Sequence, residues 1–222
     1  MIPIKDINPS RRTPVVTITL IVICFVVFFY QVQLGVLNSI FVKMFGVIPY
    51  EISHGVDIPP PSPTAPYGNL ISHQYLHGGL FHILGNMLFL WVFGDNVEDK
   101  LGRLRFIIFY TVCGISAALL QVLVYPDSTI PLIGASGAIS GVLGAYMVFF
   151  PRAQIITLVF ILFFIDIVIL PAALWISLWF LMQFVSALLS VNHLSMGGVA
   201  WFAHIGGFLT GVALAKLFTL EE

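Results

Sequence analysis

Long uncharged apolar runs constrain this chain of 222 residues more than any other feature of its sequence. Hydrophobic residues make up 59% of the chain and charged residues 9%, whereas soluble domains carry about 25% charged residues. Six runs are long enough, or nearly so, to cross a bilayer as helices. These runs are Pro14–Leu34, Gly78–Phe93, Phe106–Tyr125, Gly134–Phe150, Ala172–Val191 and Gly198–Phe218. They predict an all-α polytopic membrane protein, with six transmembrane helices in one domain over residues 1–222.

The basic residues predict how this bundle is oriented. With a cytoplasmic N-terminus, eight of the nine Lys and Arg residues lie inside and Lys43 alone lies outside, as the positive-inside rule requires. Residues 35–77 then form a long external loop, whose proline-rich part at 57–66 reads as irregular. Residues 153–170 are a seventh apolar run, but Asp166 interrupts it, so we expect a re-entrant or interfacial segment. The expected location is a multi-pass integral protein of a prokaryotic inner membrane.

Several classes of site are disfavoured by the same sequence. The net charge of −1 offers no basic footprint for nucleic acid. Cys24 and Cys113 lie in separate apolar runs, where they read as small core residues. His77 and His82 have no acidic ligand nearby, so we expect no metal, and no cofactor is indicated. The bilayer is the one partner that composition alone predicts.

Polar residues within membrane depth are costly and usually functional, and here they gather at one depth. His82 and Asn86 are four residues apart near the start of the second run, so they share a helix face. Ser136 and His204 lie near the starts of the fourth and last runs. With six crossings, all four residues lie at the outward ends of their helices. The second and fourth runs are short, so their helices begin below the surface, which predicts a wet cavity that opens outward.

Stripes of small residues predict that the helices carrying Ser136 and His204 pack tightly. Small residues recur every four positions on both helices. On one they are Ala203, Gly207, Gly211 and Ala215, and on the other Ser136, Ser140 and Gly144, flanked by Gly137 and Gly141. Close packing would bring the Ser136 hydroxyl within reach of His204 as its base, which is the arrangement of a nucleophile for acyl transfer. The Ser136 N–H at a helix start is a natural oxyanion donor, and His82 and Asn86 can add two more. Because no acidic residue lies at this depth, the sequence predicts a Ser–His dyad.

Three motifs in this order resemble the rhomboid family of intramembrane serine proteases. They are "HGGLFHILGN" at 77–86, "GASGAISG" at 134–141 and "AHIGGFLTG" at 203–211. The resemblance implies a rhomboid-like six-helix bundle in which Ser136 is the nucleophile and His204 the base. It assigns His82 and Asn86 to the oxyanion site. It also implies transmembrane-helix protein substrates, cut near their outer end after a small residue.

The resemblance separates supporting residues from reacting ones, and it also shows two departures. Residues expected to shape the site without reacting are His77, Gly134, Gly137, Gly207 and Gly211. Gly68 and Asn69 stand where many members carry a Trp-Arg pair. Ser140 stands where some members carry an aromatic ring stacked on the histidine, so His204 must be held in another way.

Other interpretations of the same residues stay open. Ser136 can be a small packing residue, His204 a buried hydrogen-bonding or proton-pathway group, and Asn86 a partner of neighbouring backbone. As a whole, the chain can be a catalytically inactive rhomboid-like protein that binds client transmembrane helices, or a small transporter. Inactive relatives usually lose the serine or the histidine, and both are present here. A transporter would show paired repeats, and the sequence has none that we detect. The oligomeric state is not indicated.

Overall fold

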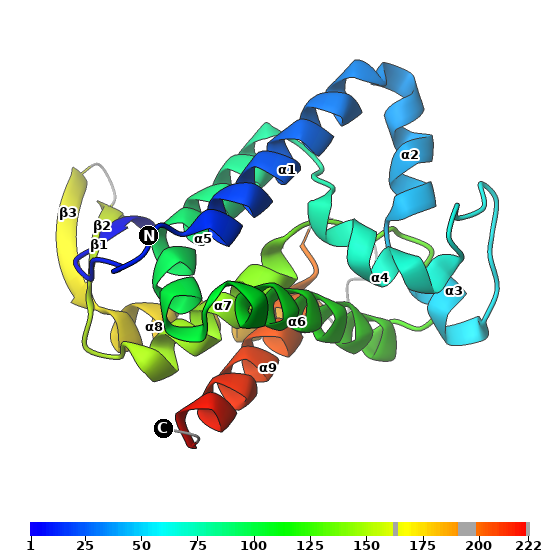
Figure 1. The fold of residues 1–222 in the computed structure, drawn as a ribbon. Helices are drawn as coiled ribbons and strands as arrows, with labels where there is room; N and C mark the ends of the chain where they lie inside the picture. Colours follow the sequence, from blue (N-terminus) through cyan, green and yellow to red (C-terminus); the bar gives the residue numbers. More distant parts are fainter. Residues whose placement is uncertain (162–163, 191–198, 221–222) are drawn as a thin grey trace.

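The structure is a computed structural model that describes residues 1–161, 164–190 and 199–220, and most of these residues are helical (Figure 1). The long helices among them are α1 (Val15–Gln33), α5 (Leu80–Leu101), α6 (Arg103–Val124), α7 (Ser136–Phe149), α8 (Ala172–Ser190) and α9 (Trp201–Leu220). The short helices are α2 (Asn38–Phe45), α3 (Pro49–His54) and α4 (Asn69–Ser72), with 3-10 turns at Gly35–Leu37, Pro66–Gly68 and His73–Tyr75. The strands are β1 (Ile2–Asp6), β2 (Gln154–Ile161) and β3 (Phe164–Pro171).

The six long helices fall on the six apolar runs, which confirms a polytopic helical membrane protein. Five of them, α1, α5, α6, α8 and α9, are long and apolar enough to cross a membrane, whereas α7 has only 14 residues. The number of six crossings therefore stays a prediction. The predicted span ends at Val191 and Gly198 lie outside the described residues.

Helix α5 runs past its predicted end at Phe93 to Leu101 because its polar residues have partners there. The carboxylate of Glu98 accepts hydrogen bonds from the backbone N–H groups of Val16 (3.0 Å) and Thr17 (2.7 Å) and from the Thr17 hydroxyl (2.8 Å). These two N–H groups belong to the first turn of α1, which has no carbonyls of its own to satisfy them. Glu98 is only 3% exposed, so the carboxylate caps α1 and joins it to α5.

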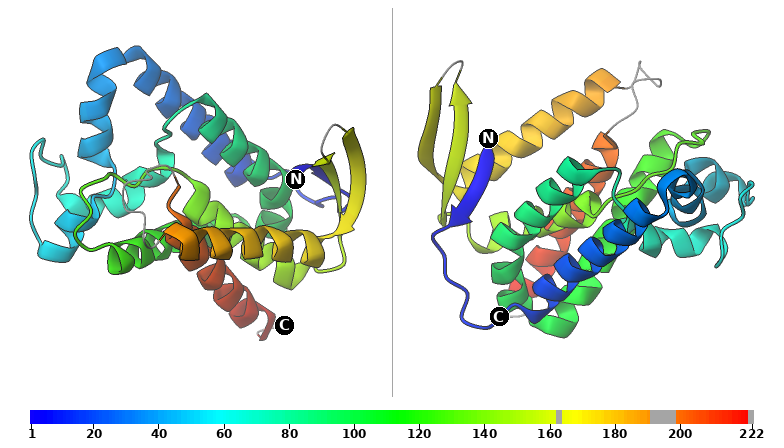
Figure 2. Two further views of the ribbon diagram at one scale, coloured as in Figure 1. Left: turned by 180° about the vertical axis from the view of Figure 1, so that it is seen from behind. Right: turned by 90° about the horizontal axis from the view of Figure 1, so that it is seen from above.

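A three-stranded antiparallel sheet, which was not predicted, lies at the end of the molecule opposite α2, α3 and α4 (Figures 1 and 2). The segment 153–170, expected to be re-entrant or interfacial, supplies the two strands of an antiparallel hairpin over residues 154–161 and 164–171, and the first of these strands also pairs with β1. Ile155 and Thr157 of β2 are buried, whereas Ile165, Ile167 and Ile169 of β3 are exposed. The density of β-branched residues in this hairpin explains the strands. Its depth in the bilayer stays a prediction.

Asp6 at the end of β1 fastens the sheet to the helices. Its carboxylate accepts hydrogen bonds from the hydroxyl of Tyr146 on α7 (2.6 Å) and from the amide of Asn96 on α5 (2.9 Å). Burial raises the pKa of Asp6 to about 6, and the hydrogen bond from Tyr146 offsets part of that increase. A side chain near the N-terminus therefore holds two core helices together.

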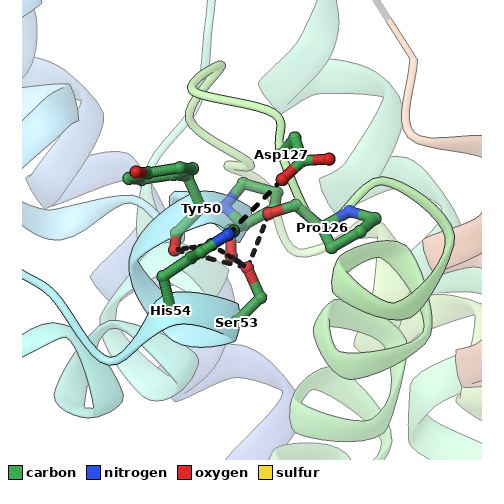
Figure 3. A network of polar contacts seen from close by, with 6 residues as sticks. Tyr50, Ser53, His54, Pro126 and Asp127 are labelled. Carbon is green, nitrogen blue, oxygen red and sulfur yellow. Dashed lines mark hydrogen bonds and ion pairs between the residues drawn. The ribbon is translucent and has the colours of Figure 1, made fainter.

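The long loop between α1 and α5 is packed against the segment that follows α6. Figure 3 shows one contact between them: the Ser53 hydroxyl donates to the carbonyl oxygen of Pro126 (2.6 Å), and His54 Nε2 lies 3.5 Å from the Asp127 carboxylate. Val47 pairs through its backbone with Leu132, four residues before α7 begins at Ser136. The loop thereby supports the chain that leads into α7.

Asn69 holds this loop from within, at one of the positions where the Trp-Arg pair is replaced. Its side chain is fully buried, and its amide donates to the carbonyl oxygen of Gly46 (2.9 Å) and to the Ser62 hydroxyl (3.0 Å). The proline-rich stretch at 57–66 contains no strand or α-helix among its described residues, as expected. The amide of Asn69 thus ties this irregular stretch to the end of α2.

Helices α7 and α9 approach so closely that their backbones touch. A Cβ atom on Gly207 would overlap the carbonyl oxygen of Gly137, and one on Gly211 would overlap that of Gly141. On α7, a Cβ on Gly144 would lie 2.5 Å from the carbonyl oxygen of Phe208. Only glycine allows this separation, which is typical of small-residue packing in membranes.

We expect Asp6→Asn to stabilise the protein more at about pH 8 than at about pH 4. A raised pKa means that the folded state binds the proton more tightly than the unfolded state, so wild-type stability falls as the pH rises towards 6. The asparagine keeps a carbonyl acceptor for Tyr146 and Asn96 and does not titrate. Thermal unfolding of both proteins in detergent at the two pH values measures the difference, and an equal difference at both would contradict the role of Asp6.

We expect Gly207→Ala to destabilise the bundle by about 1–3 kcal/mol, the usual cost of overpacking, because the added methyl group pushes α9 away from α7. Gly85→Ala is the matched control, since a Cβ on Gly85 meets nothing within 4 Å and alanine favours the helix. Denaturant or thermal unfolding in detergent checks this. A Gly207→Ala variant as stable as the control would show that the contact can relax freely.

Candidate active site

Ser136 and His204 lie within hydrogen-bond distance, although 68 positions separate them in the sequence. The Ser136 Oγ atom is 2.8 Å from His204 Nε2. Ser136 is the first residue of α7 and His204 lies in the first turn of α9, so both side chains extend from helix starts. The backbone contact between Gly137 and Gly207 lies one residue beyond Ser136 and three beyond His204, and it sets the distance between the two side chains.

The second ring nitrogen of His204 contacts a residue that sequence reasoning missed. His204 Nδ1 lies 2.8 Å from Oε1 of Gln183, on α8. The tryptophans Trp179 and Trp201 flank the imidazole, with ring centroids 6.2 Å and 6.0 Å away. His204 is therefore held by an amide and two indoles, in place of the ring absent at Ser140. The signal for Gln183 was an amide inside an apolar run, the same kind of signal that singled out Asn86.

His82 and Asn86 face the loop that ends at Ser136. A Cβ atom on Gly134 would lie 2.8 Å from His82 Nε2 and 3.7 Å from the amide nitrogen of Asn86. Gly134 also has a φ of +123°, so both the backbone conformation and the lack of space for a Cβ atom require glycine here. The Gly78 N–H donates to His82 Nδ1 (3.2 Å), which leaves the ring proton on Nε2, the atom that faces the loop.

Asn86 presents an unused donor at the same place. Its side chain is 8% exposed, and its amide nitrogen makes no hydrogen bond to a described residue. A buried amide without a partner is costly and calls for an explanation. Three potential donors thus lie around one point: His82 Nε2–H, the Asn86 amide and the N–H of Ser136 at the start of α7.

His77 lies beside this group but outside it. Its ring is 1% exposed and packs edge-on against His82, with 5.3 Å between ring centroids. Gln31 on α1 binds the His77 backbone twice, accepting from its N–H (3.0 Å) and donating to its carbonyl (3.3 Å). The ring of His77 thus contacts that of His82 and does not line the cavity beside Ser136; its supporting role stays a prediction.

A cavity of about 680 Å³ connects these residues. The polar side chains that line it include those of Ser136, His204, His82, Asn86 and Gln183. Apolar groups, among them Phe81, Phe89, Ile139 and Trp179, form much of the remaining wall. The cavity lies where the sequence predicts a wet pocket, and it is large enough to admit water to the paired hydroxyl and imidazole. That it opens outward stays a prediction.

A second Ser–His–Asp group, Ser53, His54 and Asp127, does not have this geometry (Figure 3). The Ser53 Oγ atom lies 2.9 Å from His54 Nδ1, but its shortest contact is to the carbonyl oxygen of Pro126, at 2.6 Å. The side chains of His54 and Asp127 are 42% and 83% exposed. This group joins two loops and lacks the enclosed surroundings that activate a nucleophile.

The comparisons with known proteins agree with the motifs. Residues 66–221 match the family model of the Rhomboid domain. The chain is 30% identical to RHOMBOID-like protein 6, mitochondrial, of Arabidopsis thaliana over 155 residues, which cover 68% of this chain and 44% of that protein. It is 31% identical to Rhomboid protein 1, mitochondrial, of Saccharomyces cerevisiae, over 65% of this chain and 40% of that protein. It is 38% identical to Rhomboid protease GluP of Bacillus subtilis over 78 residues, or 35% of this chain and 15% of that protein.

These relatives differ from the chain in extent and in location. The chain spans less than half the length of each of the three. Two are mitochondrial and one is bacterial, so the comparisons support an integral membrane protein but not the expected prokaryotic location. The matched domain covers most of the chain, including Ser136 and His204, and the chain therefore belongs to the rhomboid family, which includes intramembrane proteases.

Proposed function

We propose that this chain is an intramembrane serine endopeptidase that cleaves transmembrane segments of membrane proteins. One observation carries the proposal: the Ser136 hydroxyl and the His204 imidazole lie 2.8 Å apart at the edge of a cavity inside a helical membrane bundle. The pair satisfies the first geometric condition for a base-activated nucleophile. The family includes proteases, which supports hydrolysis of a peptide bond.

The catalytic steps follow from the roles of the two side chains. His204 Nε2 takes the Ser136 proton as Oγ attacks the scissile carbonyl, and it then gives that proton to the leaving amine. Water in the cavity hydrolyses the acyl-enzyme, with His204 again as the base. A polar cavity matters here because hydrolysis requires water at a depth where lipid excludes it.

The three donors near Gly134 form the oxyanion site. The tetrahedral intermediate carries a negative charge on the former carbonyl oxygen, and preorganised donors stabilise it more strongly than they stabilise the neutral substrate. His82 Nε2–H and the Asn86 amide approach from α5, and the Ser136 N–H contributes from α7, whose dipole also favours an anion. The unused Asn86 donor supports this assignment.

Transmembrane helices are the proposed substrate class because the cavity lies within the bundle and has a largely apolar wall. A scissile bond must leave its helix to reach Ser136, since a helical carbonyl is hydrogen-bonded within the helix. A protein that only binds client helices would need the apolar wall but not the paired serine and histidine. The transporter alternative has no observation in its favour.

We expect Ser136→Ala and His204→Ala each to abolish cleavage of a reporter transmembrane substrate without unfolding the protein. The matched control is Ser177→Ala, which removes an exposed hydroxyl on α8 and keeps wild-type activity. A fluorophosphonate should label wild-type protein at Ser136 and should label neither active-site variant. Cleavage by either variant in detergent would overturn the dyad.

We expect Asn86→Ala to lower kcat about 10²-fold if one oxyanion donor is lost. Asn86→Asp keeps the shape of the side chain and replaces the donor with an acceptor, so it should lower kcat at least as far. Thermal unfolding of both variants separates this effect from lost stability. Unchanged kcat in both would remove Asn86 from the oxyanion site.

A further inference from the structure

We infer that Gln183 is a positioning residue of the dyad, which holds His204 in the tautomer that can accept the Ser136 proton; this inference rests on the proposed function. An amide oxygen can only accept a hydrogen bond. Because Gln183 Oε1 lies 2.8 Å from His204 Nδ1, the ring proton belongs on Nδ1. Nε2 is then unprotonated and directed at the Ser136 hydroxyl, as a general base must be.

The orientation of the Gln183 amide follows from its other end. The amide nitrogen donates to the backbone carbonyl of Trp179, one turn earlier on α8, at 3.4 Å. A flipped amide would place two carbonyl oxygens against each other and direct an N–H at His204 Nδ1. The Trp179 carbonyl therefore selects the orientation in which Gln183 accepts from the imidazole.

Burial protects the hydrogen bond between Gln183 and His204 from competition by water. Gln183 is 4% exposed, so little water competes for its oxygen, and both ends of the amide are engaged. A satisfied buried amide is rigid, because breaking either bond leaves a polar group without a partner. The flanking rings of Trp179 and Trp201 restrict rotation of the imidazole but cannot select its tautomer. Gln183 therefore selects the tautomer of His204.

The neutral charge of Gln183 distinguishes it from the carboxylate of a Ser–His–Asp triad. The polar side chains that share the cavity with His204 come from three helices: Ser136 and Ser140 on α7, Gln183 on α8, and His82 and Asn86 on α5. Among the described residues of that lining, the titratable side chains are His82 and His204, and none is a carboxylate. Gln183 thus orients the base without placing a second charge in a membrane-embedded cavity, where charge is costly.

Three substitutions at this position test the inference against the same reporter substrate. Gln183→Leu removes the acceptor at similar volume and should lower kcat about 10²-fold at nearly constant KM, since small misplacements of catalytic groups cost about that much. Gln183→Glu restores an acceptor and adds a negative charge beside His204. It should recover part of kcat and shift the acidic limb of the kcat–pH profile upwards by about one unit or more. Met182→Leu, at the exposed neighbouring position, is the matched control.

The outcomes separate this inference from the proposed function. If wild type cleaves, Ser136→Ala does not, and Gln183→Leu cleaves as fast as wild type, the inference is overturned and the function stands. If wild type neither cleaves nor reacts with a fluorophosphonate, the proposed function itself fails. Should Gln183→Leu not fold, the pH profile of Gln183→Glu decides: an upward shift supports the positioning role, and an unmoved limb overturns it.

Discussion

Backbone contact between α7 and α9 is the constraint on which the site depends. Glycines at 137, 141, 207 and 211 bring the two helices closer than any side chain would allow. In lipid, helices gain no hydrophobic stabilisation from meeting, so dispersion contacts at short range must hold them together. The same contact sets the separation of Ser136 and His204, which means that packing and proposed chemistry share one set of residues.

Polar groups inside the bundle form a second layer of organisation. Glu98 caps α1, Asp6 binds Tyr146 and Asn96, and Gln31 holds the backbone at His77. Each joins segments far apart in the sequence and satisfies donors or acceptors that lipid cannot. The amide nitrogen of Asn86 has no such partner among the described residues, and its side chain lines the cavity beside Ser136.

The helical fold and the meeting of Ser136 with His204 could be predicted because both leave one-dimensional signals. Apolar runs mark helices, and small residues every four positions mark a close helix pair. The extension of α5 could not be predicted, since its polar residues Glu98 and Asn96 find their partners on α1 and β1, far away in the sequence. The contact between Gln183 and His204 depends on how α8 packs against α9. No residue spacing within either helix predicts that packing. The sheet joins residues some 150 positions apart, beyond any local pattern.

The pairing of β1 with β2 has a consequence for the order of assembly. Residues 2–6 emerge from the ribosome long before residues 154–161, so β1 must wait, unpaired, while most of the helices are inserted. Closure of the sheet is then a late event that brings Asp6 to Tyr146 and ties β1 to α7.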